Sequence, residues 1–234
     1  DIDWNVTARF NKPFVKVFEE ERELTVMLVI DVSASRDFGT NIRLKKELIT
    51  EIAAVLSFSA IQNNDKIGVL LFSDKVEMII PPGKGRKHIL RIIRELLGFE
   101  PQSQGTDISG ALRQLTNIIK KRCTAFVISD FIDKPFYEAL SIANKKHDII
   151  ALHVTDKREF ELPNMGLLKI RDAESGKELW IDSSSKAIRE AYNKQSRVSD
   201  ARINETFKRC GVDSVKLSTD GDYIVPLMKL FKHR

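Results

Sequence analysis

The chain has 234 residues, of which 42% are hydrophobic and 30% charged, and its formal net charge at pH 7 is +5. These values are typical of a folded domain with a hydrophobic core and argue against an intrinsically disordered chain. The charge is too small to require nucleic acid as a partner, and no apolar run approaches the roughly 18–20 residues of a membrane span. The two cysteines lack disulfide or metal spacing, so we expect a cytoplasmic protein with reduced thiols.

Residues 1–23 are expected to form an N-terminal β segment separate from the main domain, which would comprise residues 24–234. Two alternating stretches, Trp4–Phe10 and Phe14–Phe18, flank an Asn-Lys-Pro turn, a pattern typical of a β-hairpin. The chain begins with Asp1 instead of Met. We therefore interpret this hairpin as the remnant of a longer upstream β region.

The stretch Leu24–Ser35, with the sequence LTVMLVIDVSAS, organises the main domain. Its apolar and β-branched run predicts a strand that is buried on both faces. The run ends abruptly where Asp31, Ser33 and Ser35 alternate with small apolar residues. An extended or tightly looping backbone turns these three side chains toward one point, which forms an incomplete site for a hard metal ion.

Strands and helices alternate along the rest of the chain. Asn41 and Asp107 are expected to cap helices at their start, and Gly211 to end one. The alternation predicts an open, mostly parallel, doubly wound α/β sheet of the Rossmann-like type with helices on both faces. Helices are predicted over residues 41–61, 84–97, 108–119, 135–145, 186–210 and 223–231, strands over 66–72, 76–80, 123–129, 148–154 and 213–217, and a hairpin insertion near 167–182.

Oxygen-bearing side chains follow several of these strands. In doubly wound sheets, ligands bind beyond the carboxyl ends of the strands, where we expect Asp31, Ser33, Ser35, Thr106 and Asp130 to meet. Only two of the five are charged, a set that suits Mg²⁺, Mn²⁺ or Ca²⁺ and offers nothing for Zn²⁺. One coordination position would stay open to an incoming acidic group. The competing interpretation is that these residues are ordinary caps and turn formers, as we expect for Asp107 and Asp133.

Two other chemistries deserve comparison. A metal-dependent phosphohydrolase using Asp31 as nucleophile would need a second carboxylate two residues on, where Ser33 stands, and a positioned lysine, which no site loop contains. Serine hydrolysis lacks a histidine in the site loops.

Basic residues of one helix, together with 120–122, form either a nucleic-acid face, a solvated surface or a basic rim that attracts an acidic protein segment. The helix residues are Lys84, Arg86, Lys87, Arg91 and Arg94.

The D-x-S-x-S, Thr and Asp set is similar to the metal-ion-dependent adhesion site (MIDAS) of von Willebrand factor A domains. The resemblance implies that Ser33 and Ser35 bind the metal directly and Thr106 directly or through water. Asp31 and Asp130 would hold waters and orient the hydroxyls. More closely, almost the whole chain resembles the DUF58 family, through the segments Ile2–Asn5, Glu20–Arg22, Asp31–Ser35, Gly105–Ile108 and Ser129–Phe131.

DUF58 proteins carry such a domain and are commonly paired with MoxR-type AAA+ ATPases, so the resemblance implies a partner of this kind. We therefore predict a non-enzymatic, Mg²⁺-dependent adaptor module that binds an Asp or Glu of a protein partner in complex assembly or metal insertion. Mn²⁺ or Ca²⁺ would serve as alternative ions. The alternative prediction is the phosphohydrolase that uses Asp31, and neither prediction includes a membrane span or nucleic acid.

Overall fold

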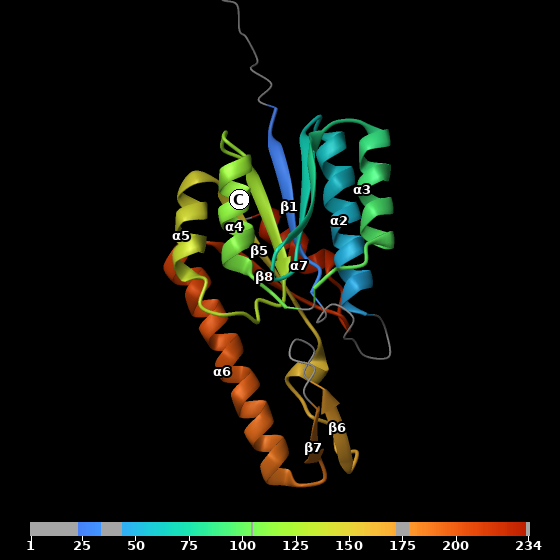
Figure 1. Ribbon diagram of the computed structural model, residues 1–234, viewed down its shortest axis with the longest axis vertical. Coiled ribbons are helices and arrows are strands. Elements are labelled where there is room, and N and C mark those ends of the chain that lie inside the picture. Colours follow the sequence, from blue (N-terminus) through green and yellow to red (C-terminus); the bar gives the residue numbers. More distant parts are fainter. Residues whose placement is uncertain (1–22, 34–43, 104, 172–177, 233–234) are drawn as a thin grey trace, which may run out of the picture.

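The computed structural model describes residues 23–33, 44–103, 105–171 and 178–232, and within them six strands form one sheet (Figure 1). Its strand order is β3-β2-β1-β4-β5-β8, with every neighbouring pair parallel except β2 and β3. The predicted open, mostly parallel sheet is confirmed. The strands are β1 (Thr25–Asp31), β2 (Lys66–Phe72), β3 (Val76–Gly83), β4 (Thr124–Ser129), β5 (Asp148–Thr155) and β8 (Asp213–Ser218).

Helices cover both faces of the sheet, as predicted (Figure 1). Alternate residues of β1 enter two separate hydrophobic clusters, because successive side chains of a strand point to opposite faces. Leu28 and Ile30 pack with α2 (Lys45–Gln62), α3 (Arg86–Gly98) and α7 (Ile224–Lys232). Met27 and Val29 pack on the other face with α4 (Ile108–Ile118), α5 (Tyr137–Lys146) and α6 (Lys186–Cys210).

Two element boundaries differ clearly from the sequence predictions. Helix α2 begins at Lys45 with Leu44 in the cap position, not at Asn41, and the Glu47 carboxylate accepts a hydrogen bond from the Leu44 amide at 3.1 Å. Strand β3 continues past Ile80 to Gly83, because its antiparallel pairing with β2 extends that far. The predicted hairpin in residues 1–22 lies outside the described residues, so the division into two segments stays a prediction.

A long helix and a hairpin extend beyond the carboxyl edge of the sheet (Figure 1). The hairpin consists of β6 (Leu167–Arg171) paired antiparallel with β7 (Glu178–Asp182), and the helix is α6. A short 3₁₀ helix, η2 (Lys157–Glu159), lies between β5 and β6. In the described part of the chain, no helix has the length and apolar character needed to cross a membrane.

The end of α6 depends on a glycine. Gly211 is left-handed, with φ of +63°, and its amide donates to the Lys208 carbonyl at 3.2 Å. We expect Gly211→Ala to lower the free energy of unfolding by about 1 kcal/mol, because a Cβ disfavours this conformation. Gly98→Ala is the control, since Gly98 lies at a helix end without positive φ and neither added Cβ meets an atom within 4 Å. Urea denaturation checks both, and equal effects would contradict the conformational explanation.

Candidate metal centre

Asp31 ends β1 and accepts hydrogen bonds on both carboxylate oxygens. The Ser33 amide donates to Oδ1 at 2.9 Å, and the Ser129 hydroxyl donates to Oδ2 at 2.6 Å. The Ser33 hydroxyl also bonds to this carboxylate. All three residues are buried. The turn that Asp31 forms with Ser33 is typical of aspartate after a strand, and it directs the Ser33 side chain back toward the carboxylate.

Asp130 follows β4 in a sharp turn. Its Oδ1 accepts from the Ile132 amide at 3.2 Å, and the next residue, Phe131, has a φ of +57°. Such a conformation is unfavourable for a phenylalanine and persists where the surroundings enforce it. The Phe131 amide donates to the Ser129 hydroxyl at 2.9 Å, and its ring packs edge-on against Phe207 of α6, with centroids 4.8 Å apart. The turn therefore fixes Asp130 beside Asp31.

Lys45, in the first turn of α2, lies buried against Asp130. Its ammonium donates to Asp130 Oδ2 at 2.9 Å and also contacts the Glu159 carboxylate of η2. Burial alone would lower the pKa of Lys45, but the charges of Asp130 and Glu159 raise it. Burial also raises the pKa of Glu159, and Lys45 partly opposes this shift. The three side chains therefore form an ionic cluster in which Lys45 and Asp130 are buried and Glu159 is partly exposed.

The sequence interpretation considered only lysines in the site loops, and so it missed Lys45 on α2 and Glu159 on η2. Lys45 is not in a site loop, but its side chain reaches Asp130 from α2. A signal was present, because Lys45 lies three, four and seven residues before the buried Leu48, Ile49 and Ile52. That spacing places a lysine on the buried face of a helix, where an unpaired charge is very unfavourable.

The charge balance of this region fits a cation. Burial, and then the neighbouring charge of Asp130, raise the pKa of Asp31 to about 6, whereas the bonds from Ser129 and Ser33 lower it. Within the described ranges, three carboxylates, those of Asp31, Asp130 and Glu159, lie in this region together with the ammonium of Lys45. No three His, Cys, Asp or Glu side chains in the described ranges could hold a metal. A cation here would therefore need hydroxyl ligands as well.

The structure brings together three of the five predicted site residues, Asp31, Ser33 and Asp130. Thr106 lies in the loop before α4, which is fixed to the same edge at two points. The Asp107 amide donates to the Ser73 carbonyl after β2, and the Ile108 amide donates to Asp133 after β4, both at 2.8 Å. Ser35 lies outside the described residues, so its place in the site stays a prediction.

The cap interpretation of the two neighbouring acids is confirmed. Asp107 accepts from the Gly110 amide at 2.8 Å, as expected for the residue before α4. Asp133 accepts from the Ile108 amide and so satisfies the first turn of the same helix. Burial raises the pKa of Asp133. Both residues therefore position the Thr106 loop.

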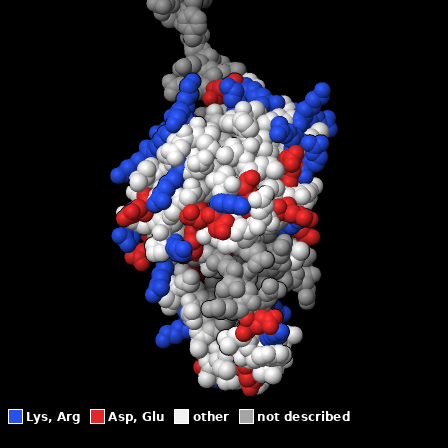
Figure 2. Space-filling model, viewed as in Figure 1, with Lys and Arg blue, Asp and Glu red and all other residues white. Residues whose placement is uncertain are grey.

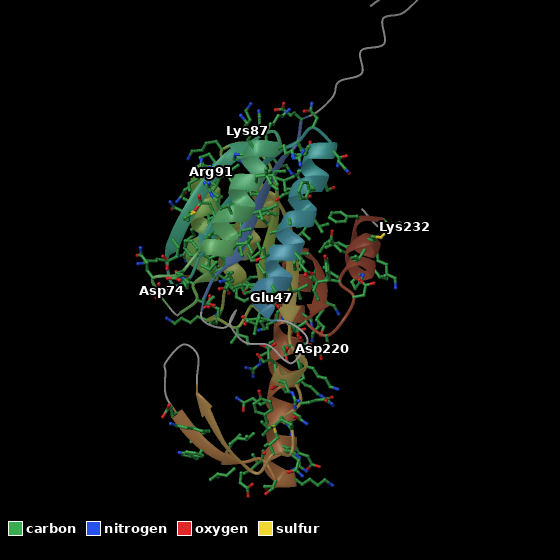
Figure 3. The ribbon with its side chains drawn as sticks, turned by 90° about the vertical axis from the view of Figure 1, so that its right-hand side faces the viewer. Glu47, Asp74, Lys87, Arg91, Asp220 and Lys232 are labelled. Atoms are coloured by element: carbon green, nitrogen blue, oxygen red, sulfur yellow. The ribbon has the colours of Figure 1, made fainter. Side chains whose placement is uncertain are left out.

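Several acidic residues lie at the carboxyl edge, whereas the basic residues of α3 lie elsewhere, so they do not form a basic rim around the site. Figure 3 shows Glu47, Asp74 and Asp220 at the carboxyl edge, and Lys87 and Arg91 toward the opposite end of the sheet domain. Figure 2 shows acidic side chains in the middle of its view and mainly Lys and Arg toward the upper end. The reason is topological: antiparallel β3 returns the chain to the amino edge, where α3 begins.

The strand order and the residues at the carboxyl edge of the sheet define the class of fold. A doubly wound sheet of this order, with helices on both faces and an aspartate and hydroxyl groups at its carboxyl edge, is a von Willebrand factor A-like fold. Residues 1–202 match the family described as "Protein of unknown function DUF58", so the chain belongs to this family.

A curated relative supports the same assignment. The uncharacterized protein Rv1480 of Mycobacterium tuberculosis is 30% identical over 238 residues, a match that covers 100% of this chain and 74% of the relative.

Two solved structures share the fold over most of the chain. Hypothetical protein BatB of Bacteroides thetaiotaomicron has a TM-score of 0.59 at 16% identity, covering 90% of this chain and 97% of its own. An aerotolerance-related membrane protein of Bacteroides fragilis has a TM-score of 0.60 at 16% identity, covering 89% and 99%. At this identity the similarity concerns the fold alone.

Proposed function

We propose that the chain is a metal-dependent protein-interaction module. Ser33, Ser35 and Thr106 would bind Mg²⁺, with Mn²⁺ or Ca²⁺ as alternatives, while Asp31 and Asp130 orient the ligands. The bound cation would supply a positive centre whose open position an Asp or Glu of a partner completes. The observation that carries this proposal is the burial of Asp31 and Asp130 near each other, with the hydroxyl groups of Ser33 and Ser129 bonded to Asp31.

The hydrogen bonds of Asp31 favour an orienting role. Its carboxylate accepts from the Ser33 hydroxyl, so this bond fixes the orientation of the Ser33 side chain relative to Asp31. Asp31 also accepts from Ser129, which in turn accepts from the Phe131 amide. This chain of bonds fixes the carboxyl ends of β1 and β4 relative to each other. A rigid arrangement of this kind suits a site whose geometry selects the ion.

The phosphohydrolase remains a second candidate because Lys45 lies at the site, as such an enzyme requires. Against it, Asp31 is 3% exposed and its oxygens already accept bonds from Ser33 and Ser129. A nucleophile needs an exposed lone pair aimed at the substrate. Measuring hydrolysis of phosphate esters with Mg²⁺ separates the candidates, because turnover that disappears in Asp31→Asn would contradict an interaction module without catalysis.

The proposed partner is a MoxR-type AAA+ ATPase, as the family resemblance implies, with the module acting in the cytoplasm. The acidic residues at the carboxyl edge bear on this binding, since Glu47, Asp74 and Asp220 lie at the same edge as the site (Figure 3). These charges repel an acidic segment when no cation is bound. We therefore expect partner binding to depend steeply on the metal, and a pull-down with and without chelator tests it.

Metal binding itself is tested by stability. Because an ion that binds only the folded state stabilises it, Mg²⁺ at a hundred times its Kd should add about 2.7 kcal/mol to the free energy of unfolding. Ser33→Ala and Thr106→Ala should remove this gain, whereas Ser59→Ala, on the exposed face of α2, should keep it. Urea denaturation in Mg²⁺ and in EDTA provides the measurement. No gain with Mg²⁺, Mn²⁺ or Ca²⁺ would contradict the proposal.

A further inference from the structure

A cavity of about 290 Å³ lies next to the candidate metal centre, with Asp130 in its lining. It is enclosed by the carboxyl ends of β4 and β5, by η2 and by the middle of α6. This volume is at the small end of the range for ligand pockets and accommodates one compact group. Its lining includes the polar residues Asp130, His153, Glu159, Ser196 and Asp200.

The face of α6 over this cavity is polar. Tyr192, Gln195, Ser196 and Ser199 line the cavity, and the burial of α6 against the sheet face begins only at Ile203. These hydroxyl and amide groups lie along about two turns of the helix, in the part that extends beyond the sheet. The cavity therefore has polar groups on the α6 side, beside apolar lining from Ile132, Phe160 and Ile203.

One buried polar atom on the cavity wall has no partner. His153 of β5 is 3% exposed, and its Nδ1 forms no hydrogen bond within the ranges that the structure describes. The charged atom beside it is Asp200 Oδ1, at 3.8 Å, and Asp200 lines the same cavity. Nδ1 therefore faces the cavity. An unsatisfied buried nitrogen is unfavourable, so its retention points to a group that binds there.

The cavity wall is rich in acceptors. Burial lowers the pKa of His153 to about 4 although Asp200 opposes this shift, so the ring is neutral at pH 7.5. With its proton on Nε2, Nδ1 is an acceptor. Asp200 pairs with Lys216 at 2.7 Å, and Asp130 and Glu159 share Lys45. Three carboxylates thus lie around the cavity, each paired with an ammonium group.

We propose that this cavity is a subsite for a guanidinium or amine group, which donates to His153 Nδ1 and to Asp200. Such a cation supplies the missing donor to Nδ1 and is attracted by the carboxylate of Asp200 beside it. The group belongs either to a free small amine or to an Arg or Lys side chain of a bound protein. The subsite goes beyond the proposed function and does not use the metal, so it is tested in EDTA, where failure of the metal site has no effect on the result.

The test is a titration of ¹⁵N-labelled protein at pH 7.5 in EDTA, observed through the histidine ring nitrogens. Agmatine represents the free amine, and N-acetyl-arginine-N-methylamide represents the side chain of a protein. We expect a saturable shift of the His153 Nδ1 signal with at least one of these probes. A shift with agmatine but not with the capped arginine assigns the subsite to a small free amine. A shift with the capped arginine assigns it to a side chain of a bound protein.

Three variants and a neutral probe serve as controls for this titration. Ser196→Leu fills the cavity and should weaken binding at least tenfold, and Asp200→Asn should weaken it at least fivefold. Ala201→Leu, on the exposed side of α6, should bind like the original chain. The proposal is overturned if the capped citrulline analogue shifts the signal equally, if Nδ1 carries the proton, if neither cationic probe binds, or if both cavity variants bind normally.

Discussion

Lys45→Met is expected to lower the free energy of unfolding by about 3–5 kcal/mol, the usual result of removing one partner of a buried ion pair. Lys45 is 1% exposed, and its ammonium bonds to Asp130 at 2.9 Å and contacts Glu159. Without it, the buried Asp130 and the partly buried Glu159 lose the ammonium group that both of them contact. Urea denaturation at pH 7.5 in EDTA measures the loss.

Two controls isolate the charge effect. Lys46→Met changes the neighbouring residue of the same helix, which is partly exposed, and should change the free energy of unfolding by less than about 0.5 kcal/mol. Adding Glu159→Gln to Lys45→Met should recover part of the loss, because one unbalanced carboxylate is removed. A loss below about 1 kcal/mol for Lys45→Met, or no recovery in the double variant, would show that this cluster is not a buried ionic unit.

Asp31→Asn should remove a pH dependence that the original chain shows in EDTA. In the folded protein, burial and Asp130 raise the pKa of Asp31 to about 6, from an ordinary value of 3.8. Between about pH 4 and pH 6 the folded state therefore keeps a proton that the unfolded chain has released. The free energy of unfolding falls as the pH rises through this window, by roughly 1–3 kcal/mol from this group.

The measurement is a series of urea denaturation curves from pH 4 to pH 7.5 on both proteins. Other buried acids also titrate there, so the difference between the two curves reports Asp31. Above pH 6, Asp31→Asn should be at least as stable as the original chain in EDTA, although it should gain nothing from Mg²⁺. The exposed Asp74→Asn serves as control and should follow the original curve. Parallel curves for Asp31→Asn and the original chain would refute the raised pKa.

The elements of the fold could be predicted because the residue pattern within each segment indicates whether it forms a strand or a helix. The run that ends at Asp31 indicated β1, and the pattern from 186 to 210, followed by Gly211, indicated α6 with both ends correct. The predicted start of α2 was wrong because Asn41 is a good cap by residue type, whereas the helix begins at Lys45, directly after Leu44. Residue type alone does not fix a helix start when several caps are possible.

The candidate site was only partly predictable. Asp31 and Asp130 were found because each follows a strand, and parallel strands place their carboxyl ends together. The bond from Ser129 to Asp31 joins residues 98 positions apart, and Lys45 meets Asp130 across 85 and Glu159 across 114. No short-range pattern contains these pairings. The location of the basic residues of α3 could not be predicted for a related reason, because the direction of α3 depends on the antiparallel return of β3.

The sequence by itself determined which segments are strands and helices, which faces they bury, and that oxygen-bearing side chains follow β1 and β4. Hydrophobic periodicity carries this information, because burial repeats every two residues in a strand and about every 3.6 in a helix. The tertiary structure alone decided which charges balance one another, since Lys45, Glu159 and His153 acquire their roles from partners on other elements. The reason is physical: the free energy of a buried charge depends on what packs against it, and packing joins residues that are distant along the chain.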